Sequence, residues 1–213
     1  MFSGLVREIA RVKSFTNNTL EIYTDYQAKL GDSIAINGAC LTAIAFFQGG
    51  VTMELSNHTK QHIAIENFTP NAKVHLEPAL SLGDRFDGHI VQGHIDGIGT
   101  INHITHNADS SDFFIQTDEV MLELMIPKGS VCVDGISLTI VDSVATSNTK
   151  GFKLTIIPHT LKNTLFGEYQ IGRRVNLESD IITRSVVSTL RNMSGNSKNA
   201  LSWRDIDMMN LNY

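Results

Sequence analysis

Residues 33–42 read Ser-Ile-Ala-Ile-Asn-Gly-Ala-Cys-Leu-Thr, and residues 130–139 read Ser-Val-Cys-Val-Asp-Gly-Ile-Ser-Leu-Thr. At this offset of 97 residues the Ser, Gly, Leu and Thr recur in the same places, and Asp replaces Asn. In each copy a short apolar run is followed by Asn-Gly or Asp-Gly, a turn dipeptide whose residues tolerate positive φ, and then by a second apolar run. Each stretch therefore predicts a β-hairpin.

Two further blocks of sequence recur in the same order along the chain. His58-Thr59 and residues 74–77 match His159-Thr160 and residues 175–178 at an offset of 101. A weaker match, at an offset of 89, joins residues 4–9 to residues 93–98. Because three matches in one order are improbable by chance, the sequence indicates an internal duplication.

The remaining strand and helix signals fit two small β units. Short apolar runs predict strands at Cys40–Ala45, Lys73–Leu76 and Arg174–Leu177, and strand signals spaced about eight to twelve residues apart favour a small barrel or sandwich in each half. One short helix is predicted at Glu119–Met125, because Asp118 is a good N-cap residue.

The C-terminal segment differs from both repeats. From Asp180 to Gly195, apolar residues recur in steps of four, four and three, which predicts a helix with a narrow apolar stripe. Such a stripe suits packing against another subunit as well as against the chain's own core. The tail beyond it carries Trp203 and Met208-Met209, for which we expect a short docked helix.

Composition excludes several functional classes. The 213 residues carry a net charge of −5, which does not suit a nucleic-acid-binding surface. No apolar run is long enough for a membrane helix, and the N-terminus does not have the pattern of a signal peptide. The two cysteines, Cys40 and Cys132, are too few for a disulfide framework. We therefore expect a soluble cytoplasmic protein.

Several motifs, taken in order, resemble the riboflavin synthase family. They are Met1-Phe2-Ser3-Gly4-Leu5-Val6 and residues 37–42, 88–97, 134–139 and 158–161. The resemblance implies an all-β fold: a tandem duplication of two six-stranded antiparallel Greek-key barrels with a C-terminal helix, assembled as a homotrimer. The expected domains are an N-terminal lumazine-binding barrel (1–89), a C-terminal lumazine-binding barrel (90–180), and a trimerisation helix with its tail (181–213).

The resemblance also implies a reaction between two identical molecules. Two molecules of 6,7-dimethyl-8-ribityllumazine give riboflavin and 5-amino-6-ribitylaminouracil, with no metal or organic cofactor. The implied partners are this small molecule and two further copies of the chain, with no nucleic acid and no membrane. Association with lumazine synthase stays open.

The family's binding positions carry over to both halves. For the first half they are Gly4, Leu5, Val6, Cys40, Leu41, Thr42, Glu54, Leu55, Ser56, Asn57, His58, Thr59, Gly93, His94 and Ile95. For the second half they are Lys128, Ser137, Leu138, Thr139, Thr155, Ile156, Ile157, Pro158, His159 and Thr160. The flat lumazine ring offers acceptors and an N–H donor that strand-edge groups and threonine hydroxyls can bind.

Three residues are expected to carry the chemistry: Ser33, Cys40 and His94. The reaction needs a base for the acidic methyl group at C7 of one lumazine and a nucleophile that adds at C7 of the other. His94 suits proton transfer near neutral pH. Cys40 either adds as a thiolate or positions the ring, and Ser33 can relay a proton.

Each candidate also has a plain structural interpretation. A cysteine in a strand is usually a small buried hydrophobe, which is what we expect of Cys132 because the first copy has Ala35 in its place. His89 and His94 could suggest a metal pair, but no third ligand has a convincing spacing.

Some positions depart from the family's usual pattern. His58 replaces a glutamate, Ile63-Ala64 replace Thr-Asn, and Asp87 replaces a glycine. The alternative function is a non-catalytic lumazine- or flavin-binding fluorescent protein of the same fold, in which one half tends to lose its motif. Here both halves keep the Gly, Leu and Thr of the central motif, which favours the enzyme.

Overall fold

The computed structural model describes residues 1–146 and 149–195, so the expected helix around Trp203 and Met208-Met209 lies outside the described residues. The chain divides after Asp180 into two compact units. The first unit holds both β-barrels and the second begins with a helix.

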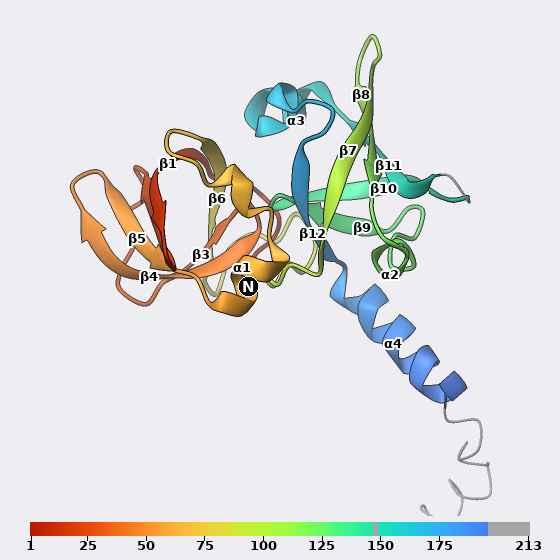
Figure 1. The fold of residues 1–213 in the computed structure, drawn as a ribbon, viewed down its shortest axis with the longest axis horizontal. Coiled ribbons are helices and arrows are strands. Elements are labelled where there is room, and N and C mark those ends of the chain that lie inside the picture. The colour runs from red at the N-terminus through yellow and green to blue at the C-terminus, as the bar shows by residue number, and fades with distance from the viewer. Residues whose placement is uncertain (147–148, 196–213) are drawn as a thin grey trace, which may run out of the picture. The chain divides into compact units, whose positions relative to one another are not determined.

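The first barrel is closed and antiparallel, with strand order β1-β2-β5-β4-β3-β6 (Figure 1, red to yellow). Its strands are β1 (Glu8–Thr16), β2 (Thr19–Tyr23), β3 (Ser33–Ile36), β4 (Ala39–Phe47), β5 (Gly50–Glu54) and β6 (Lys73–Pro78). Between β5 and β6 lie α1 (Asn57–His62) and the 3-10 helix η1 (Ile65–Asn67).

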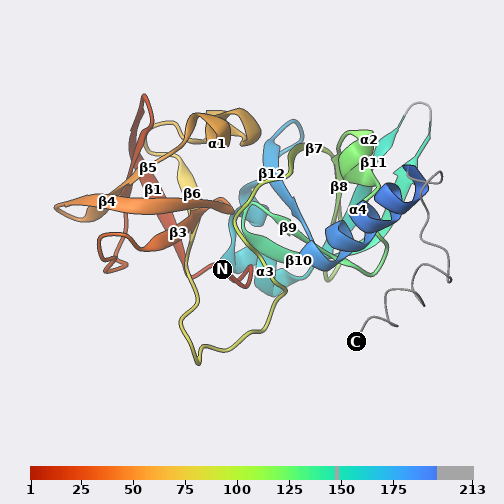
Figure 2. The same cartoon turned by 90° about the horizontal axis from the view of Figure 1, so that it is seen from below.

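The second barrel repeats this topology, with strand order β10-β11-β8-β7-β12-β9. Its strands are β7 (Gly97–His106), β8 (Ser111–Gln116), β9 (Ser130–Val133), β10 (Ile136–Ala145), β11 (Lys150–Ile156) and β12 (Arg174–Ser179). Its helices are α2 (Glu119–Leu122), α3 (Pro158–Asn163) and η2 (Leu165–Glu168). The predicted tandem duplication of six-stranded antiparallel barrels is therefore confirmed. Figure 2 shows the long connection that runs from β6 to β7.

The two hairpins that opened the sequence argument have the predicted turns. Asn37 and Gly38 have φ of 45° and 82°, and Asp134 and Gly135 have φ of 46° and 86°. Positive φ at both central residues matches the right-handed twist of the flanking strands, which explains why these dipeptides stand here. The turns also face each other, since a Cβ on Gly38 would lie 2.8 Å from the Gly135 nitrogen.

Each barrel has its own apolar core, and a small third cluster joins them. Phe2, Ala35, Val91 and Cys132 form this cluster, and the Phe2 amide donates to the Val91 carbonyl at 2.7 Å. Cys132 is 1 % exposed, so its predicted role as a core residue is confirmed.

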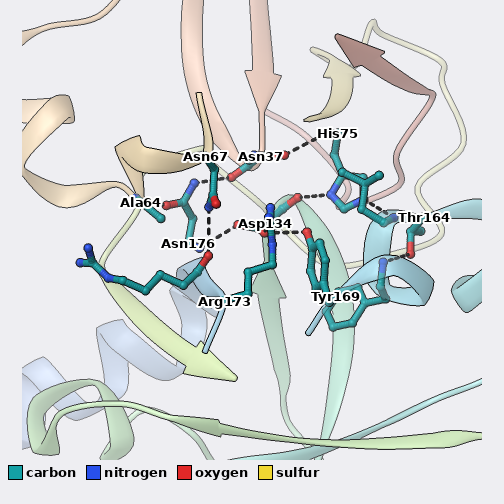
Figure 3. A network of polar contacts seen from close by, with 12 residues as sticks. Asn37, Ala64, Asn67, His75, Asp134, Thr164, Tyr169, Arg173 and Asn176 are labelled. Carbon is teal, nitrogen blue, oxygen red and sulfur yellow. Dashed lines mark hydrogen bonds and ion pairs between the residues drawn. The ribbon is translucent and has the colours of Figure 1, made fainter. Parts of the chain in front are cut away.

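Beside this cluster, a buried polar network links the turn of each barrel to the last strand of the other (Figure 3). The Asn176 side-chain amide donates to the Asn37 carbonyl at 2.8 Å, and the His75 ring nitrogen Nδ1 lies 2.8 Å from the Asp134 carbonyl. Because the Leu165 amide donates to His75 Nε2, the ring proton resides on Nδ1. These paired contacts satisfy buried backbone groups that would otherwise lack partners.

The network is not symmetric, because the second barrel adds charge. Asp134 accepts a hydrogen bond from the Tyr169 hydroxyl at 2.6 Å and lies 3.6 Å from an Arg173 nitrogen. The Arg173 guanidinium also lies 4.2 Å from the centre of the Tyr169 ring. The first barrel has Asn37 at the turn position equivalent to Asp134, so this charged group belongs to the second barrel alone.

The helix predictions met different outcomes. The predicted helix at 119–125 is shorter, because after Leu122 the amides of Leu124 and Met125 bond three residues back rather than four. Asp118 caps it as predicted, since its carboxylate accepts from the Met121 amide.

The C-terminal helix is α4 (Ile181–Gly195), and the four residues of its apolar stripe are all exposed: Ile182, Val186, Leu190 and Met193. No helix among the described residues has the length and hydropathy to cross a membrane.

Candidate functional site

The segment that precedes each barrel forms an arm that packs on the start of a central strand. The Cys40 amide, in β4, donates to the Gly93 carbonyl at 2.9 Å, and the Ser137 amide, in β10, donates to the Gly4 carbonyl at 2.8 Å. Gly4 and Gly93 have φ of 77° and 80°. A Cβ on Gly93 would lie 2.5 Å from the Cys40 Cβ, so both the backbone conformation and the close approach require glycine.

The arms cross between the barrels, which corrects one sequence-based assignment. Gly4, Leu5 and Val6 were grouped with the first half, but Gly4 contacts Ser137 and Val6 packs against the core of the second barrel. Ile95, which precedes the second barrel, packs against the core of the first. The repeat aligns each arm with the barrel that follows it, and sequence alone does not reveal that each arm packs on the other barrel.

The first barrel carries a pocket of about 150 Å³ at this crossing point. Its lining combines residues of β4, α1 and the 93–95 arm: Cys40, His58, Thr59, His62, Ile63, Gly93, His94 and Ile95. Cys40 and His94, two of the three predicted catalytic residues, therefore lie in one pocket. His62 was not among the predicted site residues, although its position four residues after His58 on a helix was the available signal.

The other predicted polar residues of this barrel lie on its strands and around α1, and Ser33, Thr42 and Glu54 are not part of the pocket lining. Ser33, Thr42 and Glu54 are cross-strand neighbours on β3, β4 and β5. Ser56 caps α1 by accepting from the Thr59 amide at 2.9 Å, and α1 then presents His58 to the pocket. Of the other predicted residues in this barrel, Asn57 begins α1 and is exposed, whereas Leu41 and Leu55 are buried core residues.

Cys40 is half-buried and its thiol is protonated at neutral pH. Burial raises the pKa of the Cys40 thiol, and a hydrogen bond with the Ser33 side chain opposes this shift only in part. The two predicted catalytic residues Ser33 and Cys40 therefore interact, but their arrangement does not generate a thiolate.

The second barrel has a different pair at the equivalent place. Ser137, which aligns with Cys40, lies 2.7 Å from His89 Nδ1 through its hydroxyl. Among the described residues, His89 Nε2 is buried without a hydrogen-bond partner, and burial lowers the pKa of this histidine. The sequence suggests His89 only as a metal partner of His94. In the structure His89 contacts Ser137 of the second barrel, whereas His94 lines the pocket of the first.

Three more of the predicted residues of the second barrel lie on β10, on β11 and in the segment before β9. Thr139 pairs with Ser130 across β10 and β9, and the Thr155 hydroxyl donates to Asp112 at 2.6 Å. Lys128 is exposed and has φ of 69°, in the position where the first repeat has Gly31.

Further residues named for this barrel lie nearby in sequence. Pro158, His159 and Thr160 begin α3 after Ile157, Ile156 is buried at the end of β11, and Leu138 packs against the core.

Comparison with known proteins also divides the chain into two similar halves. The family model of the lumazine binding domain matches residues 3–79 and again residues 92–180. Riboflavin synthase of Actinobacillus pleuropneumoniae is 37 % identical over 195 residues, which cover 87 % of this chain and 88 % of that protein. Riboflavin synthase of Bacillus subtilis (strain 168) is 33 % identical over 205 residues, covering 92 % and 93 %.

Among solved structures, this chain is similar to LumP. The crystal structure of LumP complexed with riboflavin has a TM-score of 0.73 and 20 % identity, and the match covers 84 % of this chain and 99 % of that chain. The complex of LumP with 6,7-dimethyl-8-(1'-D-ribityl) lumazine has a TM-score of 0.72 and 19 % identity, with the same coverage. At this identity the likeness establishes the shared fold.

Proposed function

This chain belongs to the riboflavin synthase family of lumazine-binding proteins, and we propose that it is a transferase that converts two molecules of 6,7-dimethyl-8-ribityllumazine to riboflavin and 5-amino-6-ribitylaminouracil. A four-carbon unit leaves one lumazine and joins the other. The atoms balance without an added oxidant or reductant, so no cofactor is required.

The observation that carries this proposal is the presence of two equivalent arm-and-strand sites in one chain. Gly93 on Cys40 and Gly4 on Ser137 are the same contact made twice. A reaction between two identical molecules needs two such sites, and holding both substrates in contact replaces a bimolecular encounter, which is worth several kcal/mol of barrier. In the proposed trimer, the first-barrel site of one subunit faces the second-barrel site of its neighbour.

We assign the proton chemistry to the pocket of the first barrel. His94 is exposed on the arm and lies beside Cys40, so it is the proposed carrier of the proton from the C7 methyl group. Because burial raises the pKa of the half-buried Cys40 thiol and keeps it neutral, we assign Cys40 a positioning role, with Ser33 as its hydrogen-bond partner. The nucleophile at C7 of the other lumazine is then water.

Replacing Cys40 with serine tests this assignment. A hydroxyl keeps the contact with Ser33, so turnover should stay within about tenfold of the native value, measured as riboflavin formed per second. If Cys40 were the covalent nucleophile, turnover would fall by roughly a thousandfold or more, because a serine hydroxyl is a much weaker nucleophile than a cysteine thiolate.

The ring is proposed to bind between the arm and strand of each barrel. In the first barrel, the residues proposed to contact the lumazine are Thr42, the stretch 54–59 and Gly93–Ile95. In the second they are Gly4–Val6, Lys128, Ser137–Thr139 and the stretch 155–160. The exposed hydroxyls of Thr42 and Thr139 occupy equivalent positions and suit the ring's polar edge.

Several wider features are also proposals. The exposed apolar stripe of α4 is the surface we assign to trimer formation. The domain division 1–89, 90–180 and 181–213 follows the family's organisation. A cytoplasmic location agrees with the two free cysteines. We assign no surface of this chain to an association with lumazine synthase.

The alternative function is a non-catalytic binder of a lumazine or flavin. LumP, which shares this fold, has solved complexes with both kinds of ligand. One assay separates the two functions: the protein is incubated with the lumazine alone and riboflavin absorbance is followed. The enzyme produces riboflavin over many turnovers. A binder retains the lumazine unchanged, with bound colour and no new product.

A further inference from the structure

Two buried glutamates hold the crossing arms. Glu77, at 3 % exposure on β6 of the first barrel, accepts hydrogen bonds from the Ser3 amide at 2.7 Å, the Ser3 hydroxyl at 2.9 Å and the Gly4 amide at 3.1 Å. One carboxylate therefore holds two consecutive backbone amides and one hydroxyl of the first arm.

Glu178 does the same for the second arm. It is 1 % exposed on β12 of the second barrel and accepts from the Gln92 amide at 2.7 Å and the Gly93 amide at 2.9 Å. Glu77 and Glu178 are equivalent in the repeat at an offset of 101. Each glutamate lies in an apolar strand of its copy of the repeat, at a position where a charged residue is unusual.

Each glutamate belongs to one barrel and shapes the site of the other. Glu77 of the first barrel holds Gly4, which lies on Ser137 of the second-barrel site. Glu178 of the second barrel holds Gly93, which lies on Cys40 of the first-barrel site. The arms have further backbone contacts, such as the paired bonds of Phe2 with Val91, but the two glutamates bind the amides of the glycines that form the contact itself.

We propose that Glu77 and Glu178 are positioning residues that set each substrate site from the opposite barrel. The effect of these glutamates on catalysis rests on the proposed function, whereas their contacts with the arms do not. A carboxylate suits this task because its two oxygens only accept hydrogen bonds. A glutamine would offer one accepting oxygen and turn an NH₂ group toward backbone amides, leaving a buried donor unpaired.

The native cysteines allow a test of the first-barrel site that needs no ligand. Cys40 lies under the Gly93 arm and is half-buried, whereas Cys132 is fully buried and should be silent in the folded protein. In E178Q, the rate of Cys40 modification by an aromatic disulfide reagent should rise by about tenfold or more, because the arm is released. E77Q, the matched control, should leave the rate within about twofold.

A mirror experiment tests the second-barrel site. In a Cys40→Ser, Ser137→Cys background, E77Q should raise the modification rate of the introduced thiol and E178Q should not. The crossed pattern is the signature of positioning from the opposite barrel. Equal acceleration by both variants, or acceleration at the variant's own barrel, would overturn the proposal.

Two further measurements separate positioning from loss of folding. Far-ultraviolet circular dichroism and the urea midpoint report whether each variant is folded. If a glutamine variant does not fold, E77D and E178D keep the carboxylate but shorten its reach, and the same crossed pattern is expected at smaller amplitude. If the crossed pattern holds and no riboflavin forms from lumazine in the native protein, the proposed function fails while this inference stands.

Discussion

At the scale of single residues, two glycines allow the arms to pack against the two sites. Gly4 and Gly93 combine positive φ with a backbone approach that leaves no room for a Cβ. The sequence placed both within motifs of the resemblance, but it could not reveal that each contacts the opposite barrel. That information resides in the tertiary contacts of Ser137 and Cys40, which are far from the arms in sequence.

Replacing Gly93 with alanine should therefore disable the first-barrel site. The new methyl group would meet the Cys40 Cβ at 2.5 Å and the Cys40 nitrogen at 3.0 Å, so the arm must move. We expect riboflavin formation to fall by about a hundredfold, measured by absorbance.

Gly49→Ala is the matched control for this variant, because Gly49 has φ of 84° and open space around its Cβ position. It carries the same backbone strain without the collision, and its turnover should stay near native. If both variants lost activity equally, strain alone would explain the effect and the close contact would have no special role.

At the scale of elements, the polar network joins the turns to the last strands. His75 on β6 and Asn176 on β12 are equivalent in the repeat, and each bonds the turn of the other barrel. The turns themselves were predictable from Asn-Gly and Asp-Gly, because those residues have a local conformational preference. The partners of these turns, His75 and Asn176, were not predictable, because a histidine and an asparagine share no sequence pattern that marks them as equivalent.

This network predicts sensitivity to acid. Burial lowers the pKa of His75 from 6.5 to about 4, so the folded protein keeps this side chain neutral while the unfolded chain takes up a proton. The stability contribution of neutral His75 is therefore complete above pH 6.5 and is lost as the pH falls from 6.5 toward 4. The expected loss is roughly 2 kcal/mol between pH 7 and pH 5.

His75→Asn should remove that part of the pH dependence. Asparagine serves at the equivalent position 176, where its amide donates to a turn carbonyl and its oxygen accepts from the Ala64 amide. Urea unfolding at pH 7 and pH 5 would measure the free energy of unfolding of both proteins. An unchanged pH difference in the variant would show that His75 is not the responsible group.

At the scale of the whole molecule, the duplication was the most predictable feature. Repeated apolar runs and turn dipeptides are local signals, and they indicated a small barrel or sandwich in each half and a terminal helix. The resemblance to a known family supplied the choice of two six-stranded barrels, which the structure confirms. The short helix α2 ended early because its amides switch to a tighter bonding pattern after Leu122, which no local preference announced. The site was predictable as a set of residues, but its division between the barrels was not.

Removal of the C-terminal helix tests the proposed assembly. A chain ending at Asp180 loses the exposed stripe of α4 and should become monomeric in analytical ultracentrifugation. Because the two substrates are proposed to meet between subunits, turnover should fall far more than riboflavin binding, which each barrel supports by itself. A monomer with native turnover would exclude a site shared between subunits.

The central claim is that one duplicated chain catalyses a reaction between two identical molecules. The most direct test is the mass balance of that reaction, with the lumazine as the sole substrate and each species quantified by chromatography after complete conversion. The account predicts two lumazines consumed for each riboflavin formed, with an equal amount of 5-amino-6-ribitylaminouracil. Recovery of the lumazine unchanged, or riboflavin formed without the pyrimidine, would contradict it.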